Sequence, residues 1–195
     1  MDLIGEGAEA KIFQVDKLIL KYIRLPKTYR IPIIDTKLRK NRNKREFKIL
    51  TKLYENKLNV PKPIQLIENK EEMSFTFEYI KGNTLKNTIN KQLLEKAFNE
   101  IIKMHNLDIT HGDLTTLNMI ETEKIYLIDF GLAQFSSKYE DKAVDLNLFF
   151  NCIKNEHPKL HIYKNTLIQK YLKGANDSNK VIEKLEKLEL RGRNK

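Results

Sequence analysis

The segment HGDLTTLN, residues 111–118, places an asparagine five positions after an aspartate. Phosphoryl transfer requires a carboxylate that orients the attacking hydroxyl, together with oxygen ligands for Mg²⁺, because the chemistry consists mostly of positioning and of neutralising charge. Asp113 fits the first role and Asn118 fits the second. The segment therefore predicts a loop that supports phosphoryl transfer.

A second acid, Asp129 in IDFGLA, follows Asn118 by eleven residues. Two short strands are expected between them, at 119–121 and 125–128, and they could bring both side chains to one cleft. Asn118 and Asp129 are therefore candidate ligands for Mg²⁺ or Mn²⁺. Asp145, in KAVDLNLF, is predicted to be a buried helix acid that braces the loop by accepting backbone hydrogen bonds.

A glycine-containing turn near the N-terminus could bind phosphate groups. IGEGAEAKI, residues 4–12, lies between two expected strands, and Gly5 and Gly7 would allow backbone N–H groups to approach phosphates closely. Taken alone, the same residues fit an ordinary hairpin turn better than a phosphate-binding turn.

Lys21 stands in the middle of an expected strand, LILKYI, among apolar neighbours. Burying an ammonium there requires a carboxylate and an anionic ligand. Glu46 in KREFKIL comes 25 residues later on an expected helix. We predict an ion pair between Lys21 and Glu46 that would hold the α and β phosphates of ATP. Considered singly, each could also be a solvent-exposed charge.

Hydrophobic periodicity predicts a β-rich part followed by a helical part. Asp35 is expected to cap the first long helix, which would end near Asn56, and the segment Glu78–Asn83 is expected to be a hinge between the two parts. The other expected strands are 10–15, 18–23, 64–67 and 73–79. The other expected helices are 91–107, 141–154, 159–172 and 179–190.

The composition is that of a globular protein. Its 195 residues, 41% of them hydrophobic, can bury a core in one domain or in two closely packed lobes. No apolar run approaches the roughly 18 residues that span a bilayer, and the start MDLIGEGAEA lacks the order of a signal peptide. We therefore expect a cytoplasmic protein with no membrane partner. Cys152, the single cysteine, is expected at a buried helix position rather than as a reactive thiol.

Basic residues cluster between Arg24 and Arg45, where nine lysines and arginines accompany one acid. This segment carries +8 of a net charge of +10, and the tail RGRNK adds further cations. Such clustering favours an anionic partner, with tRNA or another RNA as the obvious class. The alternatives are an acidic protein partner and an ordinary solvated surface in a lysine-rich protein.

Four elements in a fixed order carry a family resemblance: the glycine-containing turn, Lys21 with Glu46, H-x-D-x₄-N, and D-F-G. Over about residues 1–155 the chain resembles the protein-kinase-like fold. The resemblance implies an α+β class and a minimal two-lobed architecture within a single domain, 1–195. Residues 1–80 would form a β-rich N-lobe, and residues 81–195 a truncated helical C-lobe with a basic tail.

Departures from the common kinase pattern narrow the family. Gly112 replaces the arginine that in many kinases grips a phosphorylated activation loop, and Thr115 replaces a lysine that stabilises the transferred phosphate. No A-P-E motif follows, so protein substrates lose much of their usual docking platform. The motifs HGDLTT-L-N and GEGAEA, the insertion KTYRIPIIDTKLRKNRNKRE and the ending RGR closely resemble the PRPK-type kinases of the KEOPS complex, which are atypical small serine/threonine kinases related to the RIO kinases.

This resemblance implies binding of ATP with Mg²⁺ or Mn²⁺, and kinase or ATPase activity in support of threonylcarbamoyl-adenosine modification of tRNA. The implied partners are a tRNA threonylcarbamoyltransferase subunit, which is fused to the kinase in some members, small KEOPS subunits, and tRNA. Asp113 would act in catalysis with Lys21 and Glu46. Contacts with ATP are implied for Ile4, Gly5, Glu6, Gly7, Ala8, Ile12, Lys21, Glu78 and Ile80. Contacts with RNA or a partner are implied for Arg39, Lys40, Arg42, Arg191 and Arg193.

Three other functions fit parts of the sequence. The chain could be a catalytically weak nucleotide-binding module that bridges RNA and a partner, or a RIO-like kinase of ribosome assembly. The H-G-D loop also occurs in aminoglycoside phosphotransferases, although 195 residues leave no room for the helical insert that binds their substrates.

Overall fold

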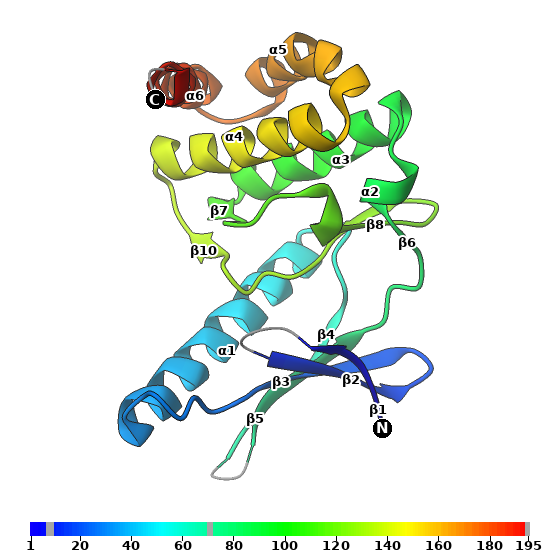
Figure 1. Ribbon diagram of the computed structural model, residues 1–195, viewed down its shortest axis with the longest axis vertical. Helices are drawn as coiled ribbons and strands as arrows, with labels where there is room; N and C mark the ends of the chain where they lie inside the picture. Colours follow the sequence, from blue (N-terminus) through cyan, green and yellow to red (C-terminus); the bar gives the residue numbers. More distant parts are fainter. Residues whose placement is uncertain (7–9, 70–71, 194–195) are drawn as a thin grey trace. The chain divides into compact units, whose positions relative to one another are not determined.

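The computed structural model describes residues 1–6, 10–69 and 72–193, and the chain forms two compact units. Unit 1 comprises Met1–Asn56 and Val60–Ile80, and unit 2 comprises Lys57–Asn59 and Lys81–Lys195 (Figure 1). Unit 1 is β-rich and unit 2 is mainly helical, as the sequence predicted. Neither unit has a described helix that is both long enough and apolar enough to cross a membrane.

Unit 1 is built on a five-stranded antiparallel sheet with the order β1-β2-β3-β5-β4. The strands are β1 (Asp2–Glu6), β2 (Ala10–Asp16), β3 (Ile19–Arg24), β4 (Pro63–Glu68) and β5 (Met73–Glu78). The four strands predicted from alternation and turn residues are confirmed with small shifts at their ends. In the turn between β2 and β3, the side chain of Asp16 accepts a hydrogen bond from the backbone N–H of Leu18 at 3.1 Å, which is the usual role of aspartate in tight turns.

The long helix α1 (Pro32–Glu55) packs on this sheet through Phe47, whose ring centre lies 6.1 Å from that of Phe75. The predicted cap at Asp35 is wrong, because the helix begins three residues earlier. Pro32 occupies the first turn, where proline is favoured since its fixed φ suits the helix and its missing N–H would be unpaired anyway. Asp35 instead lies buried inside the helix, where it accepts hydrogen bonds from Arg30 and Arg39.

Unit 2 contains the remaining helices and short strands. Its helices are α2 (Leu85–Thr88), α3 (Lys91–Asn106), α4 (Tyr139–Glu156), α5 (Lys164–Gly174) and α6 (Ser178–Arg193), with the 3-10 helices η1 (Thr116–Asn118) and η2 (Pro158–Tyr163). Its strands are β6 (Asn83–Thr84), β7 (Ile109–Thr110), β8 (Met119–Glu121), β9 (Ile125–Leu127) and β10 (Gln134–Phe135). They form the small sheets β6-β8-β9 and β10-β7.

The helical core of unit 2 is aromatic. The ring of Phe98 of α3 lies 5.8 Å from the rings of both Phe149 and Phe150 of α4, and Tyr171 of α5 lies 6.3 Å from Phe98. These contacts fix α3, α4 and α5 relative to one another, and α3 and α4 flank the predicted catalytic loop in the sequence. Edge and tilted contacts of this kind add to the area that the rings bury.

One helix prediction in unit 2 requires correction. Residues 159–172 were expected to form one helix, but residues 158–163 form η2, and the α-helix begins only at Lys164. The physical reason is burial: η2 has no buried residue, whereas α5 buries Leu167 and Tyr171. An α-helix in a folded protein is stabilised mainly by such an apolar face.

Candidate active site

Asn118 holds the side chain of Asp113 in place. The amide nitrogen of Asn118, at the end of η1, donates to the backbone oxygen of Asp113 at 2.8 Å and to its Oδ2 atom at 2.9 Å. The predicted catalytic acid and the predicted metal ligand are therefore direct neighbours. Because the amide nitrogen makes both hydrogen bonds, the side-chain oxygen of Asn118 stays available to a metal ion or a hydrogen-bond donor.

The carboxylate of Asp145 braces the start of the same loop from α4, as predicted. Its Oδ2 atom accepts the backbone N–H of His111 at 2.6 Å, and its Oδ1 atom accepts that of Gly112 at 2.8 Å. His105 of α3 contacts Oδ2 through Nε2 at 3.3 Å. Burial by itself would raise the pKa of Asp145, but these hydrogen bonds hold the pKa below its usual value. Asp145 is thus an ionised anchor for the loop backbone.

Gly112 is required by the shape of the loop. Its φ is +79°, in the left-handed region, and a Cβ atom at this position would lie 2.7 Å from the backbone oxygen of Leu132. A side chain would therefore meet both backbone strain and a backbone clash. The arginine that many kinases carry here is incompatible with this backbone, which gives a steric reason for its absence.

His111 links the loop to the segment that carries Asp129. Its Nε2 atom lies 3.0 Å from the carbonyl oxygen of Ile128, and its ring centre lies 5.0 Å from that of Phe130. The backbone N–H of Ile128 also donates to the carbonyl of Asn118 at 3.0 Å. Contacts on both sides of Asp129 therefore tie it to the loop that holds Asp113 and Asn118.

The oxygen atoms of Asn118 and Asp129 match the preference of Mg²⁺ for hard ligands. Asp129 has a φ of +60°, and its Oδ1 atom accepts the backbone N–H of Gly131 at 3.2 Å, which leaves Oδ2 for a ligand. Among the described residues, no group of three or more histidine, cysteine, aspartate or glutamate side chains could enclose a metal by itself. This donor set fits Mg²⁺ held by one or two protein groups together with substrate phosphates.

A second anchor of the loop was not foreseen from the sequence. Thr116 is fully buried, and its hydroxyl donates to Glu156 of α4 at 3.2 Å, while Glu156 also pairs with Lys86 of α2 at 2.9 Å. Forty residues separate Thr116 from Glu156, so no local pattern points to the contact. Cys152, expected to be buried, is half-buried, and its sulfur lies 3.4 Å from the Thr116 hydroxyl.

In unit 1, the predicted ion pair between Lys21 and Glu46 is wrong. The Nζ atom of Lys21 lies 2.6 Å from Oε1 of Glu72, whereas Glu46 accepts a hydrogen bond from Nη2 of Arg24 at 2.6 Å. Arg24 also donates from Nε to the side chain of Asn43 at 2.8 Å. Both Arg24 and Glu46 are almost completely buried.

The pleat of the sheet explains this exchange of partners. Successive side chains of a strand point to opposite faces, so Lys21 and Arg24, three positions apart, lie on opposite faces of β3. Tyr22, on the same face as Arg24, stacks on Phe75 with a centroid distance of 5.2 Å, and Phe75 contacts α1. Arg24 therefore faces the helix that carries Glu46, whereas Lys21 points away from that helix. The fixed charge of arginine also suits a buried carboxylate.

The predicted ATP contacts of unit 1 lie partly within the described chain. Ile4, Gly5 and Glu6 belong to β1, and Gly5 pairs in register with Ile12 of β2. Glu6 forms an exposed ion pair with Lys11 at 3.0 Å. Glu78 ends β5, and Ile80 is the last residue of unit 1. Gly7 and Ala8 lie outside the described residues.

Several cations of the basic segment 24–45 are held in ion pairs within unit 1. Besides Arg24, two of its arginines pair with Asp35, Arg30 at 3.4 Å and Arg39 at 2.7 Å. Lys44 pairs with Glu68 of β4 at 3.2 Å. Arg39 is therefore not a freely available cation. Lys40, Arg42 and Arg191 lie on helices α1 and α6, and the side chain of Arg193 lies outside the described part of the chain.

Comparison with known proteins gives concordant matches. A family model described as a RIO domain matches residues 19–149. The KEOPS complex subunit Bud32 of Pyrococcus abyssi is 38% identical, and the alignment covers 99% of this chain and 96% of that protein. A probable bifunctional tRNA threonylcarbamoyladenosine biosynthesis protein of Methanobrevibacter smithii is also 38% identical, over 98% of this chain but 36% of that protein.

Among solved structures, the chain is similar in fold to the Rio2 kinase of Chaetomium thermophilum in its ADP/Mg²⁺-phosphoaspartate complex, with a TM-score of 0.63. The identity is 15%, and the match covers 79% of this chain and 56% of that one. The α+β kinase-like fold predicted from the motifs is thereby confirmed. Together with the RIO domain match over more than half of the chain and the nearly full-length relative, this shows that the protein belongs to the Bud32 family of RIO-domain proteins.

Proposed function

We propose that this chain is an atypical serine/threonine protein kinase and ATPase that supports threonylcarbamoyl-adenosine modification of tRNA as a cytoplasmic KEOPS subunit. The observation that carries the catalytic part is the hydrogen bond from the Asn118 amide to Asp113 at 2.9 Å, in a loop whose backbone Asp145 anchors. The Asp113 carboxylate is positioned by a neutral donor and stays exposed, which suits a group that must receive a proton.

In the proposed reaction, Asp113 orients the hydroxyl of a serine, or a water molecule, toward the γ-phosphate of ATP and accepts its hydrogen bond. Lys21 neutralises charge on the phosphates. Its ammonium group donates one hydrogen bond to Glu72 and has further N–H donors for an anion. Glu46 then has a structural role, because it holds Arg24 instead of Lys21.

Asn118 and Asp129 would hold Mg²⁺, with Mn²⁺ as a substitute. When bound, the ion supplies charge neutralisation on the phosphate oxygens. Asn118 would thus serve two purposes, since its nitrogen positions Asp113 and its oxygen would bind the ion. The turn that contains Gly5 and Gly7 is assigned to the phosphates, and the backbone near Glu78 and Ile80 is assigned to adenine.

The proposed partners are a tRNA threonylcarbamoyltransferase subunit, small KEOPS subunits, and tRNA. The name of the Pyrococcus relative supports membership of the complex. The Methanobrevibacter relative supports the transferase, because its name is bifunctional and this chain corresponds to about a third of it. We also propose that the two units act as the lobes of one kinase-like domain.

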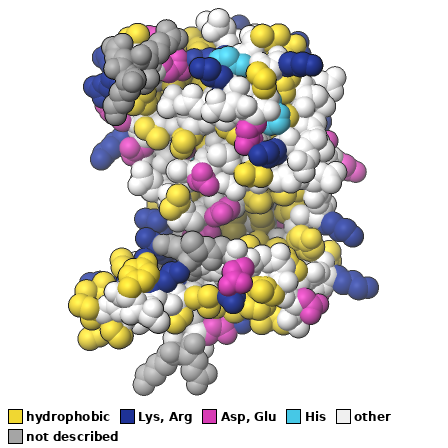
Figure 2. Space-filling view, in the orientation of Figure 1, with side chains coloured by type: hydrophobic (Ala, Val, Ile, Leu, Met, Phe, Trp, Pro, Cys, Tyr) yellow, Lys and Arg dark blue, Asp and Glu magenta, His cyan; other side chains and the backbone are white. Residues whose placement is uncertain are grey.

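The surface at the start of α1 favours a protein partner over RNA for the segment 24–45. Figure 2 shows hydrophobic side chains gathered there, at the lower left of the view. They include Tyr29, Ile31, Ile33 and Ile34, each more than half exposed. Contiguous exposed apolar side chains of this kind mark protein interfaces, and the arginines nearby are already paired.

Replacement of Asp113 by asparagine tests the catalytic proposal. The variant should lose ATP hydrolysis and autophosphorylation while its thermal unfolding stays unchanged, because Asp113 is exposed. Glu186→Gln is a matched control, since it makes the same chemical change at an exposed position of α6. Turnover that survives in Asp113→Asn would sink the assignment. Absence of turnover in the unmodified chain, even with tRNA and the transferase present, would favour a nucleotide-binding module.

A further inference from the structure

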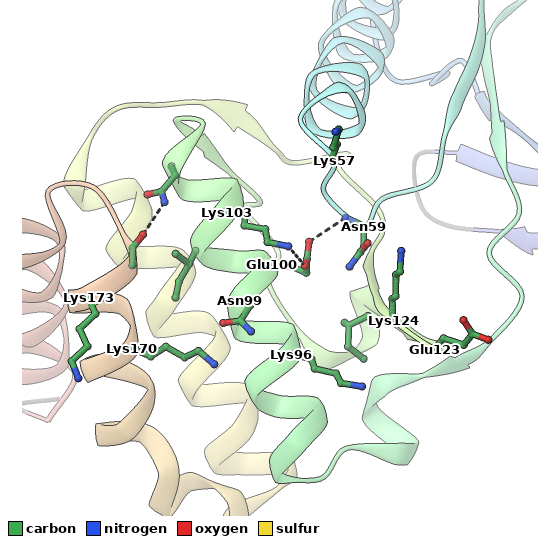
Figure 3. Close-up of a pocket in the computed structure, with 14 residues that line it drawn as sticks. Lys57, Asn59, Lys96, Asn99, Glu100, Lys103, Glu123, Lys124, Lys170 and Lys173 are labelled. Carbon is green, nitrogen blue, oxygen red and sulfur yellow. Dashed lines mark hydrogen bonds and ion pairs between the residues drawn. The ribbon is translucent and has the colours of Figure 1, made fainter.

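A lysine-rich hollow of about 780 Å³ lies within unit 2. Figure 3 shows α3 running along it, with α5 on one side and the turn between β8 and β9 on the other. Six lysines and only two glutamates line it. The lysines are Lys57, Lys96, Lys103, Lys124, Lys170 and Lys173. None of the residues discussed above as catalytic or ATP-binding lines this hollow.

Most of these lysines have no side-chain partner among the residues that the structure describes. Lys103 pairs with Glu100 at 2.7 Å, but the side chains of the other five make no ion pair or hydrogen bond with any described residue. Glu100 is further occupied by the backbone N–H of Asn59 at 3.1 Å. The hollow therefore gathers several unneutralised ammonium groups, which repel one another unless an anion lies among them.

The contrast with the basic segment 24–45 is informative. There, four of the nine cations are held in ion pairs with Glu46, Asp35 and Glu68. The sequence gives that segment the higher density of charge, yet the hollow of unit 2 brings to one place five lysines that form no ion pair with a described residue. Linear clustering in the sequence is thus a poor guide to where an anion would bind.

The spacing of the lysines favours an extended anion over a single small one. Lys96, Asn99 and Lys103 recur at three and four residues, so they share one face of α3, and Lys170 and Lys173 do the same on α5. Seven residues of helix correspond to a rise of about 10 Å. One phosphate group could not reach all of these side chains, whereas a chain of phosphates could.

The chemistry of the lining favours nucleic acid over protein. Protein interfaces are enriched in arginine, methionine and aromatic residues and depleted in lysine, and the lining has the opposite composition. Contacts to a nucleic-acid backbone come from lysine and from amides such as those of Asn59 and Asn99, which also line the hollow. We propose that this hollow binds the phosphate backbone of RNA. The choice of tRNA as that RNA rests on the proposed function.

The test is the salt dependence of RNA binding by the full chain, measured by fluorescence anisotropy with a labelled, unmodified tRNA transcript. The variant Lys96→Gln, Lys124→Gln, Lys170→Gln removes one cation from each side of the hollow. Each lost phosphate contact should lower the slope of log K against log salt by about 1, so we expect a slope smaller by about 2–3 and roughly tenfold or greater loss of affinity at low salt.

A matched control carries Lys138→Gln, Lys154→Gln and Lys159→Gln, three exposed lysines of unit 2 that do not line the hollow. It has the same net charge and should bind almost as the unmodified chain does. Equal losses in both variants would mean that only total charge matters and would overturn the proposal. Unchanged binding in the hollow variant would overturn it as well.

Two competitors separate RNA from other anions. Tripolyphosphate should displace the transcript only weakly, since it spans few of the lysines, and polyglutamate should also compete poorly at matched charge. Displacement by polyglutamate at lower concentration than by unlabelled tRNA would assign the hollow to an acidic protein instead. ATP hydrolysis without RNA should be the same in both lysine variants, so unchanged RNA binding in the hollow variant with intact turnover would be a failure of this inference alone. Turnover that survives in Asp113→Asn would contradict the proposed catalytic role of Asp113, but it would not change the expected contribution of the hollow to RNA binding.

Discussion

The carboxylate of Asp145 accepts the backbone N–H of His111 at a distance of 2.6 Å, across 34 residues of sequence. The same carboxylate accepts the neighbouring N–H of Gly112, so one side chain of α4 fixes the direction in which the loop leaves β7. Asp145 itself is fixed by His105, whose Nδ1 atom lies 2.9 Å from the hydroxyl of Tyr171. The position of Asp113 thus depends on side chains from three helices.

Asp145→Asn should therefore damage both stability and catalysis. An asparagine of the same size presents one oxygen and one N–H₂ group, so one backbone N–H would lose its charged acceptor and face a donor. Hydrogen bonds to charged groups contribute about 1.5–3 kcal/mol each, and we expect the free energy of unfolding to fall by about 2–4 kcal/mol in urea titrations. ATP turnover should fall with little change in ATP affinity. The exposed Glu140 of the same helix is the control, since Glu140→Gln weakens only a surface ion pair with Lys184 and should change neither quantity appreciably. Equal stability of both variants would contradict the bracing role.

His111 makes the stability of unit 2 depend on pH. Burial lowers the pKa of His111, although Asp145, Asp129 and Asp113 favour its charged form. Its Nε2 atom has the carbonyl of Ile128 as partner, whereas Nδ1 has no hydrogen-bond partner among the described residues. This arrangement suits the neutral tautomer of His111 that carries its hydrogen on Nε2 and donates it to the carbonyl of Ile128.

The sign of the pH effect follows from this shift. The pKa of His111 in the folded state lies below the unfolded value near 6.5. The contribution of the neutral ring to the free energy of unfolding is therefore fully present above about pH 6.5, and it is lost as the pH falls toward the folded pKa. The free energy of unfolding should decrease between pH 7.5 and 5.5, by at most about 1.4 kcal/mol per pH unit for one group. His111→Gln keeps an N–H donor without the titration and should show a flatter profile in urea titrations at several pH values. Identical profiles would show that another group is responsible.

Gly112→Ala tests the steric reason for the departure from the kinase pattern. The left-handed backbone costs an alanine about 1–2 kcal/mol, before the contact with the Leu132 oxygen is counted. We expect lower stability and slower ATP turnover, because the strained loop also carries Asp113. Gly174→Ala is the control, since a Cβ atom there would meet only the side chain of Ile102, at 3.3 Å. If Gly112→Arg folded and turned over normally, the steric explanation would fail.

The sequence predicted the local geometry of the loop 111–118 well because the information for it is local. The five-residue spacing of Asp113 and Asn118 limits where their side chains can lie within one loop. The position of Asp145 in an apolar helix predicts in the same way that its carboxylate is buried. Thr116 and Glu156 could not be paired in this way, since their contact depends on how α4 packs. Strands of two residues, such as β7 and β10, are too short to show any periodicity.

The partner of Glu46 was mispredicted for a different reason. Lys21, among apolar neighbours in its strand, was expected to need a carboxylate, and Glu46 was expected to supply it; Arg24, on the same strand, was not considered as the partner of Glu46. The kinase motifs favoured Lys21 as the partner of Glu46. Because successive side chains of a strand point to opposite faces, however, Arg24 and not Lys21 lies on the face of β3 that is packed against α1. Ion pairs with distant acids such as Glu68 are also not visible in the sequence, so charge clustering alone does not show which cations of segment 24–45 are paired.

Double-mutant cycles on these ion pairs give the last prediction. Arg24 and Glu46 are both buried, so Glu46→Gln leaves an uncompensated guanidinium and should lower the free energy of unfolding by about 3–5 kcal/mol. Lys21 and Glu72 are more exposed, and their coupling energy should be about 1 kcal/mol or less. The coupling between Lys21 and Glu46 should be near zero, because the two side chains lie on opposite faces of the sheet. All three cycles can be measured by urea denaturation with Lys21→Met, Arg24→Met, Glu46→Gln and Glu72→Gln. A coupling of Lys21 to Glu46 larger than its coupling to Glu72 would restore the kinase-type pair and remove the structural role that we assign to Arg24.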